Sequence, residues 1–227
     1  QLTDQFGFGD LYSPLGINKL VKFALDQWFY ELKGIFIIGQ GLTYNANSSD
    51  NLVPTFGNVP SDNMLTASLE DFDYRPRVPI GRLAASTPEE VRVYLNKVIE
   101  HEQNSGLSQT IADKAWMKQV LHFGGGSSNS EQIQFEGFLN NYESILEDTL
   151  FGGNVTTFLK NSSNPIQIAY SSLFDSLFHS GISLMTFFGH SSTNSFDFSV
   201  DVPENYHNKG KYPLVISNGC YSGYLFT

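Results

Sequence analysis

The sequence places its only cysteine and one of its five histidines at the ends of two similar apolar runs. His190 ends the run 181–190 (GISLMTFFGH), and Cys220 ends the run 212–220 (YPLVISNGC). In each run the apolar residues give way to small ones just before the reactive side chain. Because the carboxyl ends of parallel strands meet at one edge of a sheet, we expect the two side chains to lie together. An imidazole beside a thiol is the arrangement of nucleophilic cysteine catalysis.

The chemistry of such a pair depends on the thiolate. A free thiol has a pKa of about 8.5, and a neighbouring histidine lowers it. His190 could take the proton of Cys220 and return it to a leaving amine. Small residues on both sides of Cys220 (Asn218-Gly219 and Ser222-Gly223) predict a tight turn whose N–H groups point at a developing oxyanion. A buried, unreactive cysteine and a structural histidine are the alternative interpretation.

The rest of the chain alternates between apolar runs and amphipathic stretches, which predicts an α/β fold with parallel pairing and helices on the sheet. Residues 1–12 mix aromatics with Gly and Asp and are predicted to form a loop, and 43–72 a long surface excursion. The predicted helices are residues 18–33, 86–101, 131–150 and 165–178, and the predicted strands are 35–38, 77–81, 118–123, 155–159 and the two runs described above.

The length of 227 residues suits one large domain or two small ones. A polar gap at residues 102–110 (EQNSGLSQT) is the best candidate for a boundary. We therefore predict two α/β subdomains, residues 1–110 and 111–227.

Composition narrows the classes of partner and cofactor. The formal net charge of −10 and the lack of a basic run argue against nucleic acid. No apolar stretch reaches the roughly 20 residues of a membrane span, and no paired cysteines or His-x-x-x-His spacing predict a zinc site. The glycines 124–126 leave a nucleotide-binding loop as a weak alternative, because the Gly-x-Gly-x-x-Gly spacing is absent. We expect no cofactor and no metal.

The remaining histidines are interpreted as surface or structural residues: His101, His122, His179 and His207.

The two motifs Phe188-Gly-His190 and Asn218-Gly-Cys220 resemble those of the gingipain-type cysteine peptidases, relatives of caspases and legumains. Segments 73–82, 86–90 and 96–102 are similar to the part that closes the first subdomain of those enzymes. The resemblance covers residues 30–227 and implies a caspase-like fold of mostly parallel sheets in two adjoining subdomains, the second catalytic. It implies a protein or peptide substrate.

The resemblance also implies roles for individual residues. Cys220 would be the nucleophile and His190 the general acid and base, with the N–H groups of Ser191 and Cys220 as oxyanion donors. The family usually has Gly where this chain has Ser191, and Ala where it has Gly219. Gln132 occupies the place of the acidic residue that selects Arg in the Arg-specific gingipains, so an Arg preference is not expected.

Three residues are candidates for a substrate pocket: Gln132, Asp197 and Asn218. Asp197 is also the one candidate for an acidic residue that assists His190, although a solvated loop carboxylate is the favoured interpretation. The catalytic domain of the family continues past the nucleophile, so the pocket is expected to be incomplete in a chain that stops at Thr227.

Within the family the motifs are most similar to the PorU-type sortases of the type IX secretion system of Bacteroidetes. That similarity implies cleavage of C-terminal secretion signals, transfer to a lipopolysaccharide amine, secretion-system subunits as partners, and a location on the outer face of the outer membrane or outside the cell. An inactive relative that serves as an interaction scaffold is the alternative.

Overall fold

The computed structural model describes residues 2–10, 12–28, 31–42, 53–57, 60–107, 110–160, 171–192, 195–197 and 205–223. The chain forms two compact units, residues 1–93 and 94–223, and the division falls within the helix α3 (Pro88–Gly106). The predicted boundary at residue 110 therefore lies inside the second unit. The polar gap at 102–110 was expected to separate two subdomains, and α3 extends into its first half, as far as Gly106.

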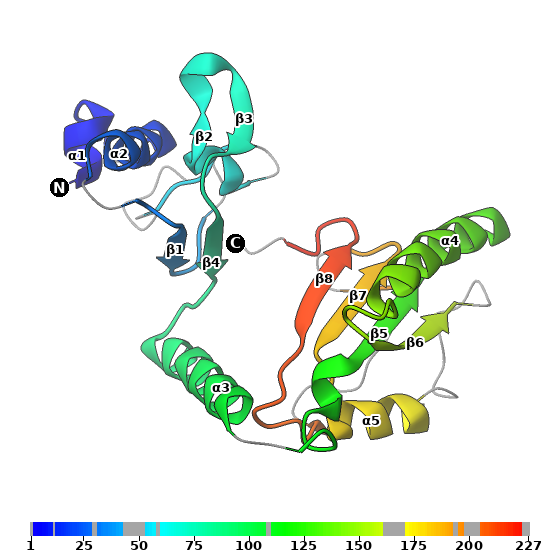
Figure 1. The fold of residues 1–227 in the computed structure, drawn as a ribbon. Coiled ribbons are helices and arrows are strands. Elements are labelled where there is room, and N and C mark those ends of the chain that lie inside the picture. The colour runs from blue at the N-terminus through cyan, green and yellow to red at the C-terminus, as the bar shows by residue number, and fades with distance from the viewer. Residues whose placement is uncertain are drawn as a thin grey trace. The chain divides into compact units, whose positions relative to one another are not determined.

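The first unit contains a small parallel sheet with two helices before it (Figure 1). Its elements are α1 (Leu2–Gly7), α2 (Pro14–Gln27), β1 (Ile35–Ile38), η1 (Asn63–Leu65), β2 (Ala67–Ser68), η2 (Leu69–Asp71), β3 (Asp73–Pro76) and β4 (Ile80–Leu83). β1 pairs in parallel with β4, and β2 pairs antiparallel with β3.

The structure corrects several predicted boundaries in this unit. The predicted loop at residues 1–12 contains α1, because the ring of Phe6 packs against Phe23 of α2 at 5.3 Å. α2 begins at Pro14, earlier than predicted, because the hydroxyl of Ser13 accepts the N–H of Leu15 as an N-cap. The predicted strand 77–81 lies at 80–83 instead, and β2 and β3 were missed. Residues 43–52, 58 and 59 of the predicted excursion lie outside the described residues.

The second unit is built on a parallel sheet of four strands in the order β6-β5-β7-β8 (Figure 1). Its elements are η3 (Ala115–Lys118), β5 (Gln119–Gly124), α4 (Asn129–Leu146), β6 (Asn154–Leu159), α5 (Ser171–Ser180), β7 (Leu184–Phe188) and β8 (Leu214–Asn218). The predicted parallel α/β class is confirmed. The predicted helix 165–178 is observed from Ser171, and residues 165–170 lie outside the described part of the chain.

The helices α4 and α5 cover opposite faces of this sheet. Successive side chains of a strand alternate between the faces, and Leu121 and Phe123 of β5 form one core with Phe174 and Phe178 of α5. On the other face, His122 of β5 contacts Tyr142 of α4, with ring centroids 6.5 Å apart. The result is a helix–sheet–helix sandwich whose central strand β5 is buried on both sides.

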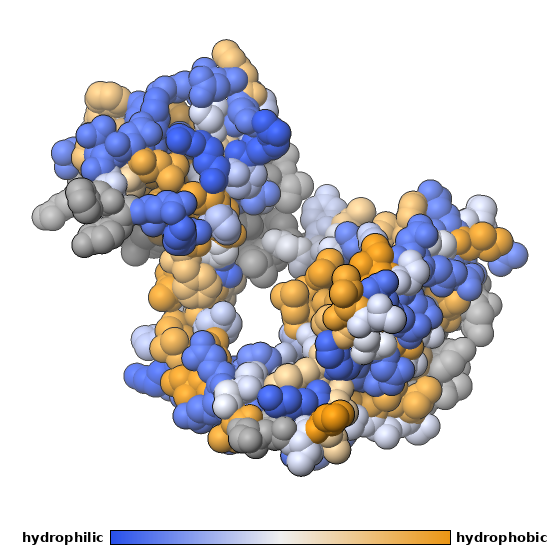
Figure 2. All heavy atoms as spheres, viewed as in Figure 1, coloured by the Kyte–Doolittle hydropathy of each residue, from blue (hydrophilic) through white to orange (hydrophobic). Residues whose placement is uncertain are grey.

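The edge strand β8 differs from β5 in its burial. Three consecutive residues, Leu214, Val215 and Ile216, are 66%, 57% and 45% exposed, so both faces of the strand carry uncovered apolar side chains. Apolar side chains are visible at the surface of this unit in the hydropathy view (Figure 2). Among the helices of the described residues, none combines the length and apolar character needed to cross a bilayer.

His122 is expected to make the fold sensitive to acid. The side chain is fully buried, neither ring nitrogen has a hydrogen-bond partner among the described residues, and burial lowers its pKa below the ordinary value of 6.5. Below about pH 6.5 the unfolded chain binds a proton at His122 more readily than the folded chain does, so acid favours unfolding. Above that pH the imidazole is neutral in both states, and His122 causes no such loss of stability. Chemical denaturation of wild type and His122→Leu at pH 7 and pH 5 should show a smaller loss of stability for the variant. Equal losses in both proteins would contradict this expectation.

Candidate active site

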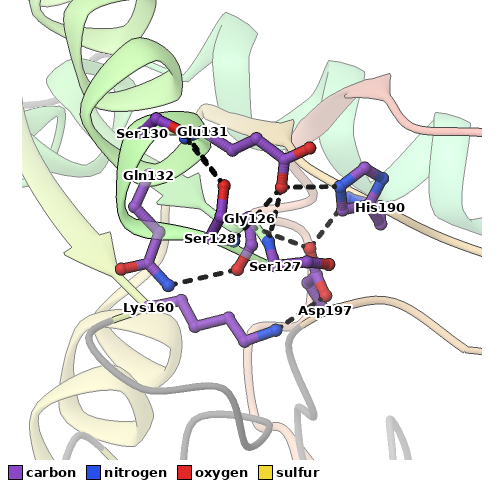
Figure 3. A network of polar contacts seen from close by, with 9 residues as sticks. All are labelled: Gly126, Ser127, Ser128, Ser130, Glu131, Gln132, Lys160, His190 and Asp197. Atoms are coloured by element: carbon purple, nitrogen blue, oxygen red, sulfur yellow. Dashed lines mark hydrogen bonds and ion pairs between the residues drawn. The ribbon is translucent and has the colours of Figure 1, made fainter.

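Residues that follow the carboxyl ends of β5, β6 and β7 meet in one cluster of polar contacts (Figure 3). β6 is followed by Lys160, β5 by the turn 125–128, β7 by His190 and β8 by Cys220. The main chain connects the segments, since the N–H of Gly125 donates to the carbonyl of Phe188 at 2.8 Å and that of Lys160 to Gly124 at 2.8 Å. Polar groups at strand ends therefore lie at one edge of the sheet.

The two predicted catalytic residues follow a pair of directly opposed strand residues. Phe188 of β7 is the register partner of Asn218 of β8, and His190 and Cys220 each stand two residues further on. The hydroxyl of Ser191 donates to the carbonyl of Cys220 at 2.5 Å, so the loops that carry the two residues are in contact. Cys220 is an exposed free cysteine. The loops that carry His190 and Cys220 therefore touch, and the expected meeting of the two side chains stays a prediction.

The turn after β8 is held in a specific conformation. The hydroxyl of Ser222 donates to the carbonyl of Gly219 at 2.9 Å, and Tyr221 adopts a left-handed conformation with φ 56°. A non-glycine residue in that region is uncommon and costs free energy, so it persists only where the surrounding structure enforces it. The nucleophile candidate therefore stands on a constrained turn.

Glu131 is the acidic residue beside the imidazole, and the sequence-based prediction missed it. Its Oε2 lies 3.3 Å from Nε2 of His190, and the same oxygen accepts the N–H of Ser127 at 2.8 Å and that of Ser128 at 3.2 Å (Figure 3). The N–H of Ser127 and then His190 lower the pKa of this carboxyl, so it is ionised at neutral pH. Ser128-x-x-Glu131 is a capping box at the start of α4, and in a sequence this pattern predicts where a helix begins, not a catalytic residue.

Asp197 is a buried structural carboxylate, so its interpretation as a solvated loop residue was wrong. Its side chain is 12% exposed and forms an ion pair with Lys160, itself 5% exposed, at 3.0 Å. The other oxygen accepts the main-chain N–H of His190 at 2.8 Å and that of Gly126 at 3.0 Å (Figure 3). Asp197 therefore holds the main chain of His190, whereas the carboxylate at the ring is that of Glu131.

The environment of Asp197 contains two opposing influences on its pKa. Burial raises the pKa of this carboxyl, while the N–H groups of Gly126 and His190 and the ammonium of Lys160 lower it. The net pKa lies below the ordinary value. The carboxylate is therefore charged at neutral pH, as its lysine partner requires.

Two candidate residues remain, one in α4 and one at the end of β8, and their proposed roles stay predictions. Gln132 of α4 is half-buried, and its Nε2 donates to the carbonyl of Gly126 at 3.1 Å. Asn218 is exposed, and its carbonyl accepts the N–H of Gly189 at 3.4 Å. Within the described residues, no hydrogen bond engages the N–H of Ser191 or Cys220, the predicted oxyanion donors.

The nucleotide-binding alternative is opposed by the turn after β5. A phosphate loop needs free N–H groups, but the N–H of Gly126 already donates to Asp197. A second negative charge at this position would be repelled by that carboxylate.

Replacing Glu131 with glutamine is expected to lower activity of the His190/Cys220 pair by about 10²-fold, the lower end of what a positioned acid–base group contributes. The amide can keep the hydrogen bonds to Ser127 and Ser128, because glutamine also serves in a capping box. The negative charge beside the imidazole is lost. The measurement is kcat/KM against pH for wild type and Glu131→Gln. An unchanged profile would show that Glu131 only caps α4.

The matched control is Ser128→Ala. It removes the hydroxyl that accepts the N–H of Glu131 at 3.3 Å and is expected to lower the free energy of unfolding by about 0.5–2 kcal/mol. It leaves the carboxylate, so activity should fall much less than in Glu131→Gln.

The fold and the site together define a class of protein: a layered α/β domain that presents a cysteine and a histidine at the ends of neighbouring parallel strands. The chain belongs to a family within that class, Peptidase family C25, whose model matches residues 1–227. The predicted gingipain-type membership is confirmed.

Solved structures confirm the fold at low sequence identity. The Arg specific cysteine proteinase gingipain R (RgpB) aligns with a TM-score of 0.62 and 18% identity over 94% of this chain and 47% of its own. A complex of Porphyromonas gingivalis RgpB pro- and mature domains aligns with a TM-score of 0.61 and 16% identity, over 94% of this chain and 48% of its own. A further structure, described only as a protease, aligns with a TM-score of 0.65 and 20% identity, over 93% of this chain and 43% of its own. The chain thus spans less than half the length of these structures. No curated protein matches its sequence.

Proposed function

We propose that this chain carries the catalytic site of a cysteine peptidase, with Cys220 as nucleophile and His190 as general acid and base. The observation that carries the proposal is the placement of both residues two positions after the opposed pair Phe188 and Asn218. The contact of Glu131 with the ring supports it, because a carboxylate at Nε2 holds the ring in one orientation. Family membership supports a thiol mechanism.

The proposed steps use both ring nitrogens of His190. With the Nε2–H donated to Glu131, Nδ1 is the unprotonated nitrogen that takes the thiol proton of Cys220. The thiolate attacks the peptide carbonyl carbon, and the N–H groups of Ser191 and Cys220 stabilise the oxyanion. The C–N bond then breaks, and His190 returns the proton to the leaving amine. Attack on the thioester by water or by a second amine, with loss of its proton to His190, regenerates the thiol.

The finer proposal concerns substrate and place. The similarity of the His190 and Cys220 motifs to PorU-type sortases supports cleavage of C-terminal secretion signals, with an amine as the second acceptor. It also supports a location on the outer face of the outer membrane and secretion-system subunits as partners. Gln132, a neutral residue whose amide is bonded to Gly126, supports a preference other than Arg at the cleavage site.

The test offers the protein peptides with Arg, Lys and uncharged residues at the scissile bond, including a C-terminal signal of type IX cargo. Each peptide is incubated with and without an added primary amine, and the products are identified by mass spectrometry. Cleavage with amine capture supports a sortase, and cleavage without capture supports a hydrolase. An absence of both, with the thiol intact, favours the inactive scaffold and overturns the proposal.

A further inference from the structure

We propose that the hydroxyl of Ser191 positions the nucleophile, and that Gly219 lacks a side chain because Ser191 fills the space beside it. The inference rests on the proposed role of Cys220. It goes beyond that role because it assigns a function to two residues that carry no reactive group. It also makes their effects on the site dependent on one another.

The first observation is the hydrogen bond from Ser191 Oγ to the carbonyl of Cys220, 2.5 Å long. Ser191 directly follows His190, so this bond joins the residue after the acid–base group to the nucleophile itself. The Ser191 loop is in turn fixed, because the N–H of Asp197 donates to the carbonyl of His190 at 2.9 Å and that of Ser192 to Ser195 at 2.7 Å. The hydroxyl therefore extends from a constrained loop.

The second observation is steric. A Cβ placed on Gly219 would collide with Ser191 Oγ and lie 3.2 Å from its Cβ and 2.9 Å from Cε1 of Phe187. Real Cβ atoms are essentially never found within 3.0 Å of other heavy atoms, so the Ser191 hydroxyl and the Phe187 ring would have to move. The φ angle of Gly219 is not in the left-handed region. The need for glycine is thus one of space.

The hydrogen bond from Ser191 Oγ to the carbonyl of Cys220 affects how the thiol is oriented. Fixing the carbonyl of Cys220 fixes the rotation of its peptide unit, and with it the direction from which the sulfur approaches a substrate. Misplacement of a reacting group by about 1 Å can cost 10²-fold in rate. The bond also uses the Ser191 side chain and leaves its N–H for an oxyanion.

The experiment is a double-mutant cycle on residues 191 and 219 in the full chain. Ser191→Gly, the single variant of the cycle, and Ser191→Ala should each lower kcat by about three- to tenfold with little change in KM, because each loses one neutral hydrogen bond. Ser191→Thr, which keeps the hydroxyl, should retain more activity. Gly219→Ala should lower kcat by about 10²-fold. Adding Ser191→Gly to Gly219→Ala should recover about tenfold, since the contact with Phe187 persists.

Ser192→Ala is the matched control, because that hydroxyl contacts Ser195 within the same loop at 2.8 Å. The same cycle is measured by the rate at which iodoacetamide alkylates Cys220 and by chemical denaturation. Those two readouts do not depend on peptide cleavage. Additive effects of the two substitutions in all three measurements would overturn the inference. A wild type that cleaves no peptide but shows the coupling would overturn the proposed function alone.

Discussion

Cys220→Ala is expected to reduce peptide cleavage by roughly 10⁴-fold or more, the effect of removing the nucleophile from a covalent mechanism. The sulfur forms the thioester in the proposed steps, and no second cysteine exists in the chain to replace it. Binding of the peptide does not require the sulfur, so KM should change little. Steady-state kinetics on wild type and variant, with mass spectrometry to count cleaved bonds, makes the comparison.

Measuring the unfolding of Cys220→Ala distinguishes a loss of catalysis from a loss of the folded structure. Cys220 is exposed, and exposed substitutions away from special backbone positions usually change the free energy of unfolding by less than about 0.5 kcal/mol. Cys220→Ala should therefore unfold at the wild-type denaturant concentration. If the variant kept more than a tenth of the wild-type rate, the assignment of the nucleophile would be wrong.

Asp197→Ala is expected to lower the free energy of unfolding by about 3–5 kcal/mol, the cost of breaking a buried ion pair from one side. It leaves the ammonium of Lys160, which is 5% exposed, without its counter-ion. It also removes the acceptor of the main-chain N–H groups of His190 and Gly126. Chemical denaturation measures the loss.

Two further variants assign the cause of that loss. Glu89→Gln, which breaks the exposed pair with Arg92, should cost no more than about 1 kcal/mol. Asp197→Ala with Lys160→Met removes both charges and should recover part of the stability, although the two N–H groups still lack an acceptor. If Asp197→Ala were no less stable than Glu89→Gln, the structural role assigned to Asp197 would be contradicted.

Acid should narrow the gap between wild type and Asp197→Ala. Because the folded pKa of Asp197 lies below its ordinary value of 3.8, its stabilising effect is present above that pH and is lost as the pH falls through the lower, folded value. The difference between the two proteins should thus be full at pH 6 and shrink below about pH 4.

The sequence predicted the sheet of the second unit well because β5, β7 and β8 are apolar runs followed by glycine or small residues, and β6 is rich in β-branched residues. β5, β6, β7 and β8 are buried or edge strands with clear limits, and the parallel class followed from their alternation with helices. Helix ends were less predictable. α1 depends on a contact between Phe6 and Phe23, and α3 is longer than its predicted stop at residue 101.

The site was predictable only where strand ends carry reactive residues. His190 and Cys220 were found because each ends an apolar run. Glu131 stands 59 residues from His190 in the sequence, and its local pattern is that of a helix cap. Asp197 resembles a solvated loop residue in sequence, since its partner Lys160 follows a different strand. Both depend on the packing of α4 and of the 190–197 loop against the sheet, which no local signal encodes.

The pH dependence of Cys220 alkylation tests the central claim, that the imidazole of His190 and the thiol act as a pair. An isolated thiol reacts only as the pH approaches about 8.5, where the thiolate forms. We expect wild type to react with iodoacetamide well below that pH and His190→Ala to lose the reaction there, with the two rates converging above about pH 9. Identical profiles for the two proteins, both rising only near pH 8.5, would contradict the account.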